Sequence, residues 1–168
     1  MPCVSAPDIN NADAAVPLPM EQMIITKNPG ETRAAGERIA RTLRGGDVVA
    51  LSGDLGSGKT TFVKGLAAAF GLNPETVTSP TFTLMNVYPL KPSYNGADTF
   101  VHIDTYRLKN EQELIAIGAE DYLGAPDAIS VIEWPEKLTV LLNNKKINHI
   151  RFHTPGSGAS TERHITIT

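Results

Sequence analysis

Cysteine is almost absent from this sequence of 168 residues, in which Cys3 is the only one. A single cysteine excludes an intramolecular disulfide framework, and it also excludes a zinc module built from several cysteines. Small exported domains commonly depend on such crosslinks. The composition therefore predicts an intracellular, cytoplasmic protein.

Excess basic charge and long apolar runs are also missing. The chain has 15 Lys and Arg against 18 Asp and Glu, a net charge of -3, so it lacks the positive surface of a free-standing nucleic-acid binder. We expect any contact with nucleic acid to go through a partner. No apolar run approaches the roughly 20 residues that span a bilayer, and the beginning MPCVSAPDIN lacks the basic and apolar parts of a secretory signal. We expect no export by that route and no membrane span.

Residues 1–20 contain four prolines and no Lys or Arg, and they show neither a helical nor a strand period. Such a segment cannot bury enough apolar surface to offset the entropy lost on ordering. We therefore predict a disordered tail over residues 1–20 and a single domain over residues 21–168.

The remaining sequence predicts an α/β fold. Asp47–Ser52 and Ala128–Trp134 are nearly continuous apolar runs, which are typical of strands covered on both faces in a parallel sheet. Two pairs of alternating segments predict antiparallel hairpins: Thr81–Tyr88 with Phe100–Asp104, and Lys146–Thr154 with Arg163–Thr168. We expect a mixed, mainly parallel sheet flanked by helices, with these hairpins added to it.

Capping signals place the predicted helices. Asn28 followed by Glu31 forms a capping box and predicts a helix that runs to about Arg44. Asn110 followed by Glu113 predicts a second capping box at the start of a shorter helix.

The segment Gly53–Thr60 reads GDLGSGKT, which matches the phosphate-binding pattern GxxxxGK[ST]. It lies between a buried strand and a helix, where backbone N–H groups converge on phosphate oxygens and the helix N-terminus adds partial positive charge. We expect Lys59 to reach the β and γ phosphates and to stabilise charge during transfer, and the Thr60 hydroxyl to ligate Mg²⁺. The fold expected is therefore of the P-loop NTPase type. Nucleotide contacts are predicted for Asp54, Leu55, Gly56, Ser57, Gly58, Lys59, Thr60 and Thr61.

Two carboxylates end predicted strands. Asp104 ends the strand FVHID and Glu133 closes the strand AISVIE, so both emerge at the edge where α/β sheets place their ligands. Mg²⁺ takes oxygen ligands, which makes both residues candidates for the metal. In one arrangement Glu133 holds the metal while Asp104 polarises the attacking water or holds a metal-bound water. The sequence pattern does not order the two.

Other polar residues have two interpretations each. His102 lies on the same face of its strand as Asp104, where it either assists the chemistry or is a structural histidine. Ser79–Thr81 is either a nucleotide-sensing loop or a rigid connection. Trp134 either shields the metal site or packs under the proline that follows it. We predict no zinc site and assign the remaining histidines to the surface: His149, His153 and His164.

Five segments occur in a fixed order: GDLGSGKTTF (Gly53–Phe62), SPTFTL (Ser79–Leu84), HIDTYRL (His102–Leu108), the series from Glu113 to Tyr122, and IEWPE (Ile132–Glu136). In order and approximate spacing they resemble the TsaE (YjeE) family. That family consists of small bacterial P-loop ATPases required for making threonylcarbamoyladenosine on tRNA. Ser57 departs from the alanine usual in the family's loop, a small change where the contacts are mainly backbone.

The resemblance implies a Mg²⁺-dependent ATPase that hydrolyses ATP slowly alone. It assigns the metal ligands to Thr60 and Glu133, the catalytic acid to Asp104 and a functional tryptophan to Trp134, which we add to the nucleotide contacts. It also implies TsaB and TsaD as protein partners, with tRNA reached only indirectly through the complex.

Two other functions fit the phosphate loop. A small-molecule kinase is the first, although such enzymes close an arginine-bearing lid and only Arg107 lies between Arg44 and Arg151. A GTP-operated switch is the second, although the sequence has no NKxD to select guanine. The candidates for contacting adenine are Thr32 and Arg163.

Overall fold

The computed structural model of the protein describes residues 21–156 and 161–168. The predicted disordered tail at residues 1–20 and Cys3 lie outside the described residues. Among the described residues, none of the helices combines the length and the apolar character needed to cross a membrane.

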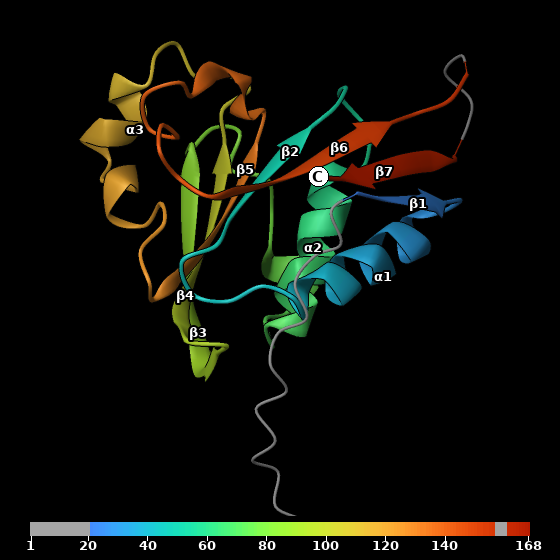
Figure 1. Cartoon of the computed structure of the whole chain (residues 1–168), viewed down its shortest axis with the longest axis horizontal. Coiled ribbons are helices and arrows are strands. Elements are labelled where there is room, and N and C mark those ends of the chain that lie inside the picture. The colour runs from blue at the N-terminus through green and yellow to red at the C-terminus, as the bar shows by residue number, and fades with distance from the viewer. Residues whose placement is uncertain (1–20, 157–160) are drawn as a thin grey trace, which may run out of the picture.

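Seven strands form a single sheet: β1 (Gln22–Thr26), β2 (Val48–Ser52), β3 (Met85–Tyr94), β4 (Ala97–Asp104), β5 (Ala128–Glu133), β6 (Ile147–His153) and β7 (Arg163–Ile167). Their order across the sheet is β1-β7-β6-β2-β5-β4-β3 (Figure 1). Strands β6, β2, β5 and β4 are parallel, whereas β3, β7 and β1 add antiparallel pairs at the two sides. The predicted α/β fold with a mixed sheet and antiparallel hairpins is confirmed.

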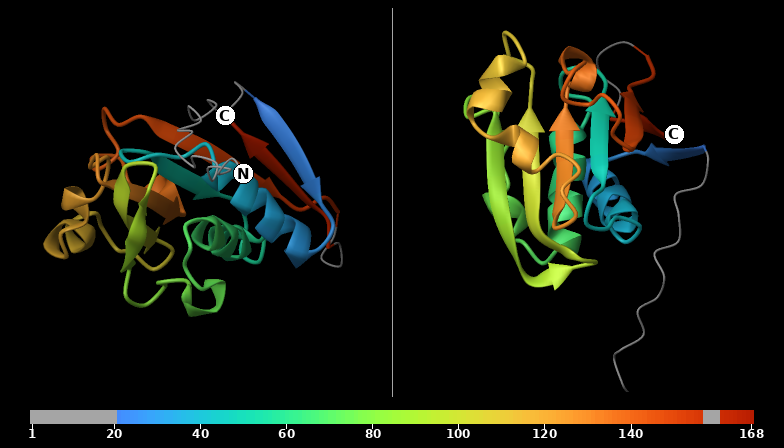
Figure 2. Two further views of the ribbon diagram at one scale, coloured as in Figure 1. Left: turned by 90° about the horizontal axis from the view of Figure 1, so that it is seen from below. Right: turned by 60° about the vertical axis from the view of Figure 1, so that its left-hand side comes forward.

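Helices lie on both faces of the sheet (Figure 2). One face is covered by α1 (Pro29–Ala40) and α2 (Lys59–Ala69), and the short helix η1 (Pro74–Thr76) follows α2. The other face is covered by α3 (Gln112–Ala116) and two 3-10 helices, η2 (Ala119–Asp121) and η3 (Pro135–Lys137). This sandwich explains why the middle strands have continuous apolar sequences, because neither face of them meets water.

Two hydrophobic clusters lie on opposite faces of the sheet. Val49 and Leu51 of β2 pack with Phe62 of α2 on one face. Val48 and Ile132 pack on the other face with the α3 layer. Successive side chains of a strand point to opposite faces, so β2 contributes to both clusters.

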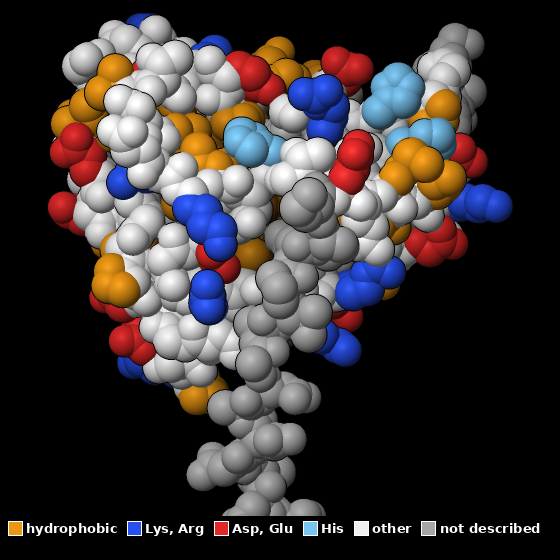
Figure 3. Space-filling view, in the orientation of Figure 1, with side chains coloured by type: hydrophobic (Ala, Val, Ile, Leu, Met, Phe, Trp, Pro, Cys, Tyr) orange, Lys and Arg blue, Asp and Glu red, His pale blue; other side chains and the backbone are white. Residues whose placement is uncertain are grey.

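Strand β6 alternates between buried and exposed side chains. Ile150 and Phe152 are buried, whereas His149, Arg151 and His153 are exposed. In Figure 3, histidine and basic side chains gather on this face over β6 and β7. The assignment of these two histidines to the surface is confirmed.

Helix α1 begins as predicted and ends earlier. The Asn28 side chain accepts a hydrogen bond from Glu31 N at 2.9 Å. The helix ends at Ala40 instead of Arg44. The Thr42 hydroxyl donates a hydrogen bond to Ile39 O at 2.7 Å, and the last turn tightens.

The second predicted capping box is wrong. The N-cap of α3 is Glu111, which makes no side-chain cap hydrogen bond. Its carboxylate instead accepts backbone N–H groups of the loop after η3, from Thr139 at 2.6 Å, Val140 at 3.0 Å and Leu141 at 2.8 Å. Glu111 thus ties α3 to that distant loop.

Strand β3 begins at Met85 rather than at Thr81. The residues before it form a turn, in which Leu84 N donates to Pro80 O at 2.7 Å. The Thr81 hydroxyl donates to Asp104 Oδ2 at the end of β4 at 2.8 Å, which keeps Thr81 out of the strand.

Candidate functional site

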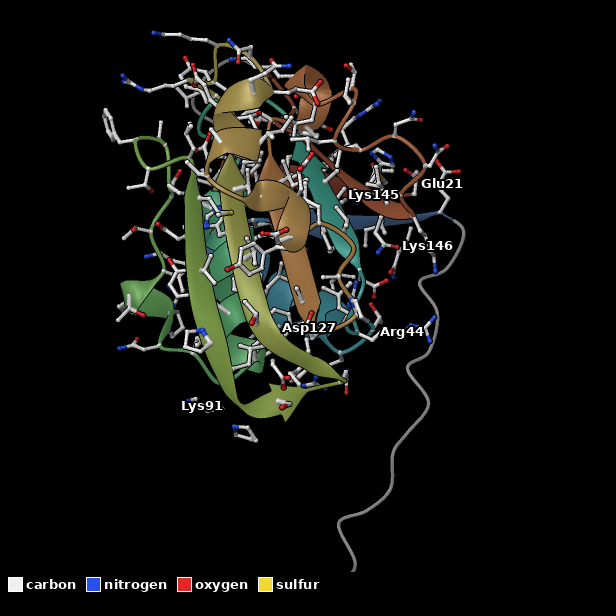
Figure 4. The ribbon with its side chains drawn as sticks, turned by 90° about the vertical axis from the view of Figure 1, so that its left-hand side faces the viewer. Glu21, Arg44, Lys91, Asp127, Lys145 and Lys146 are labelled. Carbon is white, nitrogen blue, oxygen red and sulfur yellow. The ribbon has the colours of Figure 1, made fainter. Side chains whose placement is uncertain are left out.

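The loop Gly53–Gly58 joins the carboxyl end of β2 to the start of α2. Gly53 has a φ of 135°, and a Cβ atom there would lie 2.5 Å from Phe152 O on β6. Only glycine fits that position, since the backbones approach too closely for a side chain. Arg44 and Asp127, labelled in Figure 4, precede β2 and β5 and mark the opposite edge of the sheet.

Lys59 is the first residue of α2 and is 4% exposed. Its Nζ donates to Gly53 O at 2.7 Å and to Asp54 O at 2.9 Å, and it lies 4.0 Å from the centroid of the Trp134 ring. Burial lowers the pKa of Lys59 from its ordinary value, while the carboxylates of Glu133 and Asp104 act in the opposite direction. The ammonium is thus held inside the loop that it would serve.

Glu133 ends β5 directly beside the phosphate loop. Its Oε1 accepts a hydrogen bond from the Thr60 hydroxyl at 2.9 Å and lies 2.9 Å from His102 Nε2. A hydroxyl and a carboxylate are the hard oxygen donors that suit Mg²⁺. The predicted metal pair is therefore brought together, and its chemistry fits the cation.

Asp104 ends β4 and is the register partner of Glu133 across the parallel pair. Its Oδ2 accepts from the hydroxyls of Ser79 at 2.6 Å and Thr81 at 2.8 Å. Its Oδ1 accepts from Tyr106 N at 2.9 Å. The two predicted carboxylates therefore lie side by side with different partners. Glu133 accepts from Thr60, whereas Asp104 accepts from Ser79 and Thr81.

Trp134 follows β5 with a φ of 63°. Its N–H donates to Leu51 O at 3.1 Å, and its carbonyl accepts the Thr105 hydroxyl. The indole packs at 5.1 Å from the Tyr106 ring. These contacts place the ring over Lys59, at the wall of the phosphate loop rather than in the core.

The residues around the loop enclose a cleft of about 570 Å³. Apart from the adenine candidates Thr32 and Arg163, the predicted catalytic, metal-binding and nucleotide-contacting residues all line it except Asp54, whose carbonyl accepts a hydrogen bond from Lys59 Nζ. The cleft is lined by Leu55, Gly56, Ser57, Gly58, Lys59, Thr60, Thr61, Ser79, Thr81, Asp104, Tyr106, Arg107, Glu133 and Trp134.

Sequence reasoning did not single out Tyr106, which lines this cleft and touches both Asp104 and Trp134. The sequence feature that could have indicated Tyr106 is its position in the turn two residues after Asp104. Arg107 also lines the cleft, with its guanidinium carbon 4.5 Å from the ring centroid of Phe82, which is 82% exposed.

A smaller pocket of about 180 Å³ lies on the other side of the loop. It brings together Thr32 and Arg163, the residues proposed from sequence for adenine, with Gly58 and Thr61. The described residues contain no group of three or more His, Cys, Asp or Glu side chains able to hold a metal ion.

The fold and the site define an α/β protein with a GxxxxGK[ST] loop at the carboxyl edge of its sheet and two carboxylates opposite. The family model described as "Threonylcarbamoyl adenosine biosynthesis protein TsaE" matches residues 26–165. The chain belongs to the TsaE family.

Characterised relatives agree with this assignment. The chain is 36% identical over 139 residues to the tRNA threonylcarbamoyladenosine biosynthesis protein TsaE of Streptomyces coelicolor, covering 81% of this chain and 88% of that one. It is 34% identical over 143 residues to the protein of the same name from Bacillus subtilis, covering 85% and 82%. The crystal structure of YdiB from Bacillus subtilis superposes with a TM-score of 0.65 at 30% identity, covering 88% of this chain and 84% of that one.

Proposed function

We propose that this protein binds Mg·ATP and hydrolyses it in support of threonylcarbamoyladenosine modification of tRNA. One observation carries the proposal: the Thr60 hydroxyl and the Glu133 carboxylate meet at 2.9 Å beside the phosphate loop. The name of the family supports the role in this pathway, and the geometry of the site supports nucleotide binding.

The roles of the residues follow from their positions. Backbone N–H groups of the loop and the Lys59 ammonium would stabilise charge on the transferred phosphoryl group. Thr60 and Glu133 would hold the cation, which when bound neutralises charge on the β and γ phosphates. Nucleotide has to draw the ammonium away from the loop carbonyls and the Trp134 ring.

Asp104 is the carboxylate we assign to the attacking water. In the structure, the hydroxyls of Ser79 and Thr81 both donate to its Oδ2, and we expect the attacking water to take the place of one of them. The Ser79–Thr81 loop would therefore move when nucleotide is in place, which supports the interpretation of this loop as a switch.

TsaB and TsaD are the proposed partners, and tRNA would be reached only through them. Leu55, Phe82 and Tyr106 are exposed by 75%, 82% and 44% at or beside the mouth of the cleft. Exposed apolar side chains gathered at one place are typical of a protein interface. The net charge of -3 supports indirect contact with tRNA.

The test compares ATP turnover in wild type, Lys59→Ala and Glu133→Ala, with and without TsaB–TsaD. Both substitutions are expected to lower turnover by about 100-fold or more, since Lys59 would stabilise the transferring charge and Glu133 would hold the cation that does the same. Lys64→Ala, on the same helix but paired with Glu75 at 3.6 Å, is the matched control. Turnover of Lys59→Ala equal to that of Lys64→Ala would falsify the proposal.

The small-molecule kinase remains the second candidate. Among the described residues, Arg107 is the one arginine that lines the cleft, and its guanidinium lies over the Phe82 ring. ATP-dependent phosphorylation of added nucleosides or small acids, in place of phosphate release, would favour the kinase.

A further inference from the structure

His102 is completely buried in β4, with 0% of its surface exposed. Its register partner on β5 is Val131, while Asp104 pairs with Glu133 further along. The imidazole reaches toward the end of β5, where Nε2 lies 2.9 Å from Glu133 Oε1. The phosphate-loop chemistry described above does not use it.

The contact has a defined direction. A carboxylate only accepts hydrogen bonds, so Nε2 carries the hydrogen and donates it to Oε1. The other ring nitrogen, Nδ1, is buried without a hydrogen-bond partner among the described residues. The imidazole's one polar contact is therefore with Glu133.

Packing alone does not account for histidine at this position. A buried polar atom without a partner costs stability, and the neighbours of His102 on its own face of the sheet, Phe100 and its register partner Val131, are apolar and fully buried. An aliphatic side chain would fill the same space without that cost. What histidine adds is the hydrogen bond to Glu133.

The hydrogen bond leaves one oxygen of Glu133 available. Oε1 accepts from both Thr60 and His102, while no hydrogen bond to Oε2 is found within the described part of the chain. Glu133 lines the cleft. Two donors on Oε1 fix the rotation of the carboxylate and thereby the direction in which the other oxygen, Oε2, points.

We propose that His102 is a positioning residue that orients the Glu133 carboxylate for the cation of Mg·ATP. This inference rests on the proposed function. Groups that hold a metal-binding carboxylate in place commonly affect metal affinity by about 10-fold to 100-fold. The Thr60 hydroxyl can give its hydrogen to Oε1 and still offer a lone pair to the cation, so His102 and Thr60 act on Glu133 together.

Trp134 provides the measurement, because it is the sole tryptophan and lies 4.0 Å from Lys59 Nζ. Its fluorescence is followed while the β,γ-imido analogue of ATP is added, first with EDTA and then over a series of Mg²⁺ concentrations. The affinity in EDTA reports the loop alone. The Mg²⁺ concentration at half-maximal effect reports the Glu133 carboxylate.

His102→Gln and His102→Asn form the matched pair. Glutamine places an amide N–H near the position of Nε2, whereas the shorter asparagine does not reach Glu133. We expect Asn to raise the half-maximal Mg²⁺ concentration by about 10-fold or more and Gln to keep it near the wild-type value. Affinity in EDTA should be unchanged in both. The His102→Leu variant should behave as the Asn variant does. If the Leu variant does not fold, the comparison of the Gln and Asn variants decides whether His102 positions Glu133.

Ser130→Ala controls for general loosening of the sheet, since Ser130 lies on β5 and the change removes the hydrogen bond from its hydroxyl to Tyr122 O after η2. A wild-type Mg²⁺ dependence in the Asn variant, or equal losses in Asn and Gln, would overturn the role of His102 and leave the proposed function standing. Absence of nucleotide binding by the wild type would overturn both.

Discussion

Trp134 has a backbone conformation that bulky residues rarely adopt, with a φ of 63°. The conformation is held from two sides, by Leu51 O of β2 and by the Thr105 hydroxyl after β4. It turns the indole over Lys59 instead of continuing β5. Three strand ends therefore cooperate to place one ring at the phosphate loop.

Glu111 is the residue whose charge we expect to matter most for stability. Burial acts to raise the pKa of its carboxyl, but the backbone N–H groups of Leu141, Val140 and Thr139 together with the Thr139 hydroxyl outweigh it and lower the pKa to about 2. Because the folded pKa is below the unfolded value of 4.5, this stabilisation is present above that value and is lost as pH falls toward 2.

Glu111→Gln should lower the free energy of unfolding at pH 7 by about 1 to 3 kcal/mol, since hydrogen bonds to a charged acceptor are replaced by weaker ones. The measurement is urea unfolding at pH 7 and pH 3. The difference between wild type and variant should shrink at pH 3. Glu113→Gln, on the same helix but without these contacts, is the control, and an equal loss in both variants would contradict the assignment.

At the scale of elements, local signals predicted most of the fold. The apolar runs of β2 and β5, the cap at Asn28 and the loop at Gly53–Thr60 act within a few residues, so they could be read from sequence. Two of the wrong predictions depend on distant partners. Thr81 lies outside β3 because its hydroxyl donates to Asp104. Glu111 does not cap α3 with its side chain because its carboxylate accepts N–H groups of the loop near Thr139.

The site was predictable to the same extent. The pattern GxxxxGK[ST] indicated the phosphate loop, and the strand ends indicated Asp104 and Glu133. The contact of His102 with Glu133 crosses two strands whose register the sequence does not contain. It follows only once β4 and β5 are aligned.

Helices α1 and α2 pack closely at Gly65, where an added Cβ would lie 2.0 Å from Arg33 O. Gly65→Ala should therefore lower the free energy of unfolding by about 1 to 3 kcal/mol, because overpacking forces the backbones apart. Thermal and urea unfolding measure it. Gly30→Ala on α1, where the nearest atom is a side-chain oxygen of Asn28 at 3.2 Å, should change stability by less than about 1 kcal/mol. Equal effects would exclude the close contact as the cause.

At the scale of the whole molecule, the distribution of charge bears on the proposal that tRNA is reached through partners. The net charge is -3, and the exposed basic and histidine side chains over β6 and β7 lie on one face (Figure 3). The phosphate loop lies at the carboxyl edge of the sheet. The net negative charge gives no indication of a strongly positive surface for tRNA.

We expect the isolated protein to bind tRNA with a dissociation constant weaker than about 10 μM at physiological salt, the range of non-specific electrostatic contacts. Electrophoretic mobility shifts with labelled tRNA measure it, and a mixture of TsaB and TsaD with the protein serves as the positive control. Sub-micromolar binding by the isolated protein would show that it holds tRNA directly.

Strand β1 pairs with β7 along its whole length, from Gln22 opposite Ile167 to Thr26 opposite Arg163. The first described strand therefore depends on the last one, which the ribosome delivers after every other described element. Until β7 emerges, β1 has no neighbour in the sheet, and the apolar side chain of Ile24 lacks its partner Ile165. The sheet can be completed on this side only after β7 has been synthesised, which leaves the edge of β1 exposed to chaperones until then.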